Sequence, residues 1–109
     1  MGIFDRFKKN NDISESLSLK IKSQDLVKEY QFEEAISCLE HALKIDESTE
    51  TENQDEIKSM FWLSKGKIWR EWGQYFANQE KFREGMDCYS KAFECYDRSK
   101  RYSRSYDDF

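Results

Sequence analysis

Apolar residues recur along this chain every three or four positions, a spacing that predicts amphipathic helices. Two stretches show it most clearly, each with the i, i+3, i+4, i+7 spacing of a helix with one buried face. Their apolar sets are Phe32, Ala35, Ile36, Leu39, Ala42 and Leu43, and then Phe82, Met86, Tyr89, Ala92, Phe93 and Tyr96. The chain has no proline and only four glycines, whereas strands joined by tight turns need such residues. The pattern therefore predicts an all-α fold.

Four helices in two antiparallel hairpins account for this pattern. They are expected over about residues 13–29, 33–46, 55–79 and 81–99. The long third helix carries apolar residues on two adjacent stripes, and a helix of that kind packs between two neighbours. We therefore expect it at the centre of a domain over residues 13–99. A flexible or packed N-terminal segment (1–12) precedes this domain, and a C-terminal tail (100–109) follows it.

The two hairpins are related by an internal repeat. A shift of fifty residues superposes several identical residues, among them Gln24 on Gln74, Phe32 on Phe82, Glu34 on Glu84, Cys38 on Cys88 and Ala42 on Ala92. Self-similarity at a fixed spacing is typical of helical repeat proteins. Each hairpin is therefore interpreted as one structural unit of a short array.

The second hairpin resembles the tetratricopeptide repeat, whose pattern is W-x2-L-G-x2-Y, then A-x3-F and a second small residue. The residues that carry the resemblance are Trp69, Trp72, Gly73, Phe76, Gly85, Tyr89 and Ala92. Gly85 stands where the family has alanine, at the close crossing of the two helices. The first hairpin matches only in its second helix, through Ala35, Leu39 and Ala42, because Lys22 and Ser23 replace a large apolar residue and glycine. The resemblance implies a right-handed array of helix pairs.

The resemblance also implies a peptide-binding face, formed by the first helix of each repeat. Its positions in this sequence are Lys20, Gln24, Val27, Lys28, Arg70, Gln74, Ala77 and Asn78. This set contains three cations and no acid, so an acidic segment or a C-terminal carboxylate is the expected ligand. The other interpretation is an ordinary solvated helix surface.

Catalytic chemistry has little support in the sequence. His41 is the single histidine, and no phosphate-binding loop, serine elbow or spaced carboxylate set is present. Cys38, Cys88 and Cys95 lack the spacing of a zinc site. We therefore expect a non-enzymatic scaffold without metal or cofactor, located in the cytoplasm, where buried thiols stay reduced.

The two ends of the chain support a rival hypothesis. Ile3, Phe4 and Phe7 lie among basic residues, and the basic stretch 98–104 leads into a tail with aromatic residues. Such segments occur in membrane-surface anchors and in RNA-binding tails. The alternative function is therefore an adaptor for membrane surfaces or nucleic acid, both disfavoured because these segments are short. The acidic stretch 46–56 is interpreted as a solvated loop.

The ends of the predicted array have no polar capping helix. Repeat arrays need such caps, and exposed apolar surface is usually covered by another chain. A two-fold homodimer through the faces of the end helices is therefore expected.

Overall fold

Four α-helices make up the part of the chain that the structure describes. The computed structural model describes residues 3–49 and 52–107, with side chains described for residues 12, 14–49 and 52–103. The helices are α1 (Ile3–Lys28), α2 (Phe32–Thr49), α3 (Gln54–Asn78) and α4 (Phe82–Asp107). No strand occurs in this described part of the chain, and the predicted all-α fold is confirmed.

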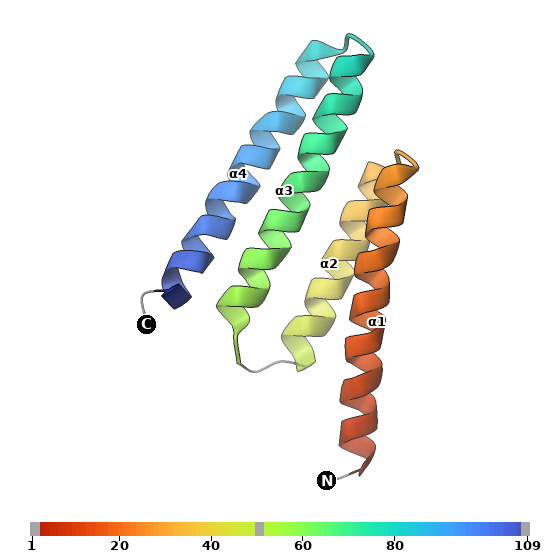
Figure 1. Ribbon diagram of the computed structural model, residues 1–109, viewed down its shortest axis with the longest axis vertical. Helices are drawn as coiled ribbons and strands as arrows, with labels where there is room; N and C mark the ends of the chain where they lie inside the picture. Colours follow the sequence, from red (N-terminus) through yellow and green to blue (C-terminus); the bar gives the residue numbers. More distant parts are fainter. Residues whose placement is uncertain (1–2, 50–51, 108–109) are drawn as a thin grey trace.

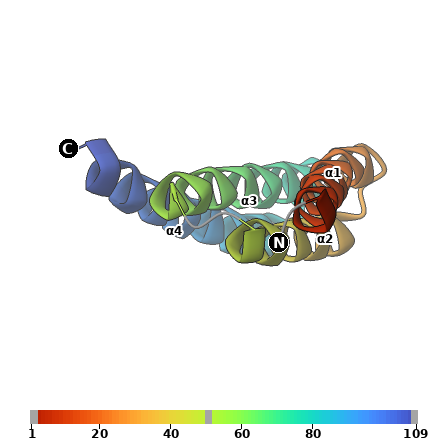
Figure 2. The ribbon, with the colours of Figure 1, turned by 90° about the horizontal axis from the view of Figure 1, so that it is seen from below.

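The helices form two antiparallel hairpins side by side (Figure 1). α1 packs along α2, α2 against α3, and α3 along α4, so α3 has the predicted central position. The assembly is thin, with Cα extents of 57 × 34 × 13 Å. An end-on view shows α1 and α3 on one side of this slab, with α2 and the first part of α4 on the other (Figure 2).

The outer helices extend beyond their predicted limits. α1 begins at Ile3 and α4 ends at Asp107, so residues 3–12 and 100–107 continue the helices next to them. Hydrophobic spacing shows which face of a helix is buried and does not fix the residue at which the helix ends. The interpretation of stretch 46–56 as a loop was wrong for 46–49 and 54–56, which belong to α2 and α3.

Both hairpin turns have the same geometry, fifty residues apart. Tyr30 and Glu80 adopt left-handed backbone conformations, with φ of 63° and 62°. In each turn the next residue donates its N–H to a carbonyl five positions earlier, Gln31 to Leu26 and Lys81 to Phe76, both at 2.9 Å. The left-handed residue itself donates to the carbonyl three positions earlier, at 3.0 Å in both turns. Together these bonds form a Schellman motif, which ends a helix and reverses the chain.

The helix crossings repeat in the same way. In the first hairpin, the buried Ser23 hydroxyl donates to the carbonyl oxygen of Ala35 at 2.8 Å. Fifty residues later stand Gly73 and Gly85, where a Cβ on either would lie 3.1 Å from the other's carbonyl oxygen. The predicted role of Gly85 at a close crossing is confirmed. Ser23, which departs from the family pattern, occupies the matching position in the first hairpin.

The buried face of α4 differs from the one that the spacing predicted. α4 buries a stripe of small residues against α3: Gly85, Cys88, Ala92, Cys95 and Ser99. Phe82, Met86 and Phe93, which the spacing placed in the core, are exposed. The stripe of small residues is the buried one because small side chains let α4 approach the face of α3 on which Gly66 and Gly73 are buried.

Aromatic stacking joins the two hairpins. Trp72 of α3 stacks on Phe32 of α2 with ring centroids 5.6 Å apart, and on Trp69 at 4.9 Å. Tyr30, in the first turn, stacks on Tyr75 at 5.1 Å. These rings pack against a buried cluster of Leu26, Phe32, Ala35, Ile36, Leu39 and Ile68. The core therefore lies where α1, α2 and α3 meet.

Candidate functional site

The predicted peptide-binding residues lie on α1 and α3, two helices on the same side of the slab (Figure 2). Six of them are exposed, namely Lys20, Gln24, Lys28, Arg70, Gln74 and Asn78. Val27 and Ala77 are half-buried, and Val27 packs against the core cluster. α1 reaches the second hairpin almost only through α2, so the two sets belong to one side without forming one tightly packed surface.

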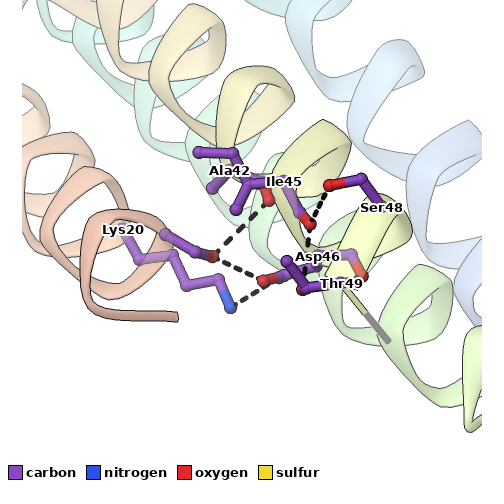
Figure 3. Close-up of polar contacts among 7 residues, drawn as sticks. Lys20, Ala42, Ile45, Asp46, Ser48 and Thr49 are labelled. Carbon is purple, nitrogen blue, oxygen red and sulfur yellow. Dashed lines mark hydrogen bonds and ion pairs between the residues drawn. The ribbon is translucent and has the colours of Figure 1, made fainter. Parts of the chain in front are cut away.

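Lys20 is paired within the chain. Its ammonium lies 2.9 Å from the Asp46 carboxylate of α2 (Figure 3). The Ser16 hydroxyl donates to the other oxygen of the same carboxylate at 2.6 Å. Because the Asp46 side chain is 17% exposed and the Lys20 side chain 46%, the pair is solvent-screened and holds α1 to α2 only weakly. The acidic residue Asp46 therefore lies beside the predicted face, although no residue predicted for that face is acidic.

The α3 set also makes contacts within the chain. Gln74 donates through Nε2 to Asn78 Oδ1 at 2.9 Å, and its Oε1 accepts a bond from the Tyr89 hydroxyl of α4 at 3.2 Å. The Arg70 guanidinium lies 3.8 Å from the carboxylate of its exposed neighbour Glu71. Two of the three cations of the predicted set therefore have an acid nearby, Asp46 beside Lys20 and Glu71 beside Arg70.

Sequence reasoning missed four exposed apolar residues on the same two helices. They are Leu17 and Ile21 on α1, which are 57% and 51% exposed, and Met60 and Leu63 on α3, at 63% and 41%. Exposed residues at successive intervals of four, three and four positions form one line along α1. They are Leu17, Ile21, Gln24 and Lys28. An apolar residue at helical spacing fits a core and an exposed face equally well, and only burial distinguishes the two cases.

α1 and α3 both contact the same part of α2. Ser16 of α1 contacts the carbonyl of Ala42 on α2 at 3.5 Å. The Lys65 ammonium of α3 lies 3.7 Å from the carboxylate of Glu40, which precedes Ala42 by half a turn on α2. Leu17 lies one residue from the first of these contacts, and Leu63 lies two residues from the second. We call these exposed residues on the same side of the two helices the α1–α3 face: Leu17, Ile21, Gln24, Lys28, Met60, Leu63, Arg70 and Gln74.

A second set of cations is stacked on tryptophan rings. Arg98 of α4 lies 4.6 Å from the Trp62 ring centroid and Lys91 lies 4.4 Å from that of Trp69. Lys65 lies 5.0 Å from the Trp62 ring centroid. Cations at such distances are attracted by the ring faces. The basic stretch 98–104 is thus partly engaged within the fold.

The remaining candidates from the sequence are the basic stretch near the C-terminus, His41 and the apolar residues near the N-terminus. Arg101 pairs with Asp97 at 2.9 Å along α4, and His41 is exposed on α2. The side chains of Ile3, Phe4 and Phe7 lie outside the described residues. Within the described ranges, no helix is long and apolar enough to cross a membrane. No three His, Cys, Asp or Glu side chains there are grouped to hold a metal.

Two of the three thiols have shifted acidity. Burial raises the pKa of the Cys88 thiol, against the opposing effect of Lys91. Burial likewise raises the pKa of Cys95, where Lys65 and Arg98 act in the opposite direction. A thiol with a raised pKa is largely protonated at neutral pH and is a poor nucleophile. These cysteines therefore have the chemistry of packing residues.

Comparisons with known proteins identify no relative. The chain matches no protein-family model, no curated protein and no solved structure.

Proposed function

We propose that this protein is a non-enzymatic interaction module of tetratricopeptide type that binds an extended partner segment on the α1–α3 face. The observation that carries the proposal is the exposure of apolar side chains on both helices, together with exposed cations and amides on the same two helices. Burying such side chains contributes about 25 cal/mol per Å². The repeated turns and helix crossings support the tetratricopeptide resemblance. A cytoplasmic location belongs to the proposal, because buried thiols stay reduced there.

The chemistry of the face favours a partner segment with both apolar and acidic residues. Apolar partner side chains would rest on Leu17, Ile21 and Leu63, where most of the binding free energy arises. A partner carboxylate would pair with Lys28 at the exposed end of α1, or with Arg70 across the face. Lys20 contributes less, because a ligand there competes with Asp46. Charge-assisted hydrogen bonds then set the preference for acids over other polar residues.

A random-peptide library selected on the full-length chain tests this proposal. We expect the selected peptides to combine an acidic residue or free C-terminus with two or more apolar residues. Ile21→Ser should weaken their binding at least about tenfold, and Lys28→Glu several-fold, since each removes one part of the contact. Titration calorimetry with a selected peptide measures both effects.

Lys44→Glu is the matched control, since Lys44 is exposed on α2 outside the face and the substitution changes the charge equally. Its binding should equal that of the wild type. Peptides that bind the Ile21→Ser and wild-type chains equally well would show that another surface is used. Equal effects of Lys28→Glu and Lys44→Glu would reduce the acidic preference to an effect of net charge.

A further inference from the structure

α4 carries an exposed apolar stripe that the fold leaves uncovered. Phe82, Met86 and Phe93 are 63%, 65% and 74% exposed, among the highest values for large apolar residues here. Tyr89 lies between them and is half-buried, with its hydroxyl bonded to Gln74. At about 100° per residue the four side chains fall within an arc of about 60°. We call Phe82, Met86, Tyr89 and Phe93 the α4 stripe.

The spacing of the α4 stripe is the same in both directions. Its members follow one another at four, three and four residues. A second copy of α4, laid antiparallel about a two-fold axis between residues 87 and 88, would therefore bring like positions together. Phe82 would face the partner's Phe93, and Met86 would face the partner's Tyr89. A two-fold contact requires such a self-complementary surface, and antiparallel helices also align their dipoles favourably.

The charges beside the stripe fit the same axis. Arg83 directly follows Phe82, and Glu94 directly follows Phe93, so both lie on one flank of the stripe, and both are exposed. When Phe82 faces the partner's Phe93, Arg83 comes beside the partner's Glu94. The symmetry repeats this opposite-charge contact at the other end. Charge complementarity at a rim suppresses wrong pairings and sets the register.

On these grounds we propose that the chain forms a two-fold homodimer in which the α4 stripes of two copies pack antiparallel. Three side chains with these exposures offer roughly 400 Å² of apolar surface per copy, given about 150–250 Å² for a fully buried aromatic. With the polar rim, the contact falls at the low end of specific interfaces, which bury about 1,200–2,000 Å² in total. The dimer should therefore dissociate at micromolar concentrations. It does not depend on peptide binding by the α1–α3 face.

Sedimentation equilibrium of the full chain between about 1 and 200 µM tests the dimer. The mass should rise from that of the 13.2 kDa monomer toward twice that value. Phe93→Glu should weaken association at least about tenfold while the circular dichroism spectrum stays unchanged, because this side chain is exposed. Ile21→Glu places the same charge on the α1–α3 face and should leave association unchanged. A monomer at every concentration would overturn the proposal, as would equal effects of the two variants.

A charge exchange tests the register itself. Arg83→Glu and Glu94→Arg should each weaken the dimer several-fold, and the double variant should recover most of the loss. The two residues lie about 16 Å apart along one helix, so recovery can arise only from contact between copies. Additive losses in the double variant would refute the antiparallel register.

Discussion

Gly73 of α3 and Gly85 of α4 bring two helix backbones into contact, since a Cβ on either would stand 3.1 Å from the other's carbonyl oxygen. A large side chain at this crossing would force α3 and α4 apart. We therefore expect Gly85→Leu to lower the free energy of unfolding by about 1–3 kcal/mol or more. Urea denaturation measures the loss. Ser37→Leu, at an exposed position of α2, is the control and should change stability by less than about 0.5 kcal/mol. Wild-type stability of Gly85→Leu would contradict the crossing.

The hydroxyl of Tyr96 is buried, and no described residue forms a hydrogen bond with it. A buried polar group without a partner costs free energy, so its removal should not harm the fold. We expect Tyr96→Phe to leave stability unchanged or to raise it by about 1 kcal/mol in the same assay. Tyr89→Phe removes a hydroxyl that does bond, to Gln74, and should lose up to about 1 kcal/mol. A clear loss in Tyr96→Phe alone would reveal a partner for its hydroxyl.

Stability should fall as the pH rises above about 9. Burial raises the pKa of Cys88 and Cys95 above their ordinary value of 9.0, so the unfolded chain releases these protons first. Alkaline pH therefore favours the unfolded state, by up to about 1.4 kcal/mol per pH unit for each thiol. The contribution of the thiols is fully present below pH 9 and is lost above it. Urea titrations between pH 7 and 10 measure this slope.

The double variant Cys88→Ala/Cys95→Ala separates the thiols from the tyrosines and lysines that titrate in the same range. Its absolute stability is lower because alanine leaves small cavities, so only the slopes are compared. A shallower decline than in the wild type is expected, and equal slopes would assign the pH effect to other groups.

Much of the fold could be predicted from local spacing. The helix pairs and the central place of α3 follow from apolar periodicity, and the tetratricopeptide resemblance also marks Gly73 and Gly85. The predicted helix limits put breaks at both hairpin turns. The left-handed geometry of Tyr30 and Glu80 carried no signal, because neither residue is glycine. Ser23 departs from the family pattern, yet it occupies the helix crossing of the first hairpin. The sequence does not show this role, because it depends on a hydrogen bond to Ala35 on the next helix.

The candidate site was only partly accessible from the sequence. The tetratricopeptide resemblance implied a surface position for Gln24, Lys28, Arg70 and Gln74, and all four are exposed. The pairing of Lys20 with Asp46 was not foreseen, because the two residues belong to different helices. The exposure of Leu17 and Ile21 was not foreseen either, since an apolar residue at helical spacing fits a core and a binding face equally well.

The sequence alone determined that this chain forms two helical hairpins related by a repeat, because helical periodicity is a property of residues only a few positions apart. The tertiary structure alone decided which apolar stripe of α4 is buried. The small residues face α3, and Phe82, Met86 and Phe93 remain in solvent. That choice depends on how closely two backbones can approach, which Gly73 sets from a helix remote in the sequence.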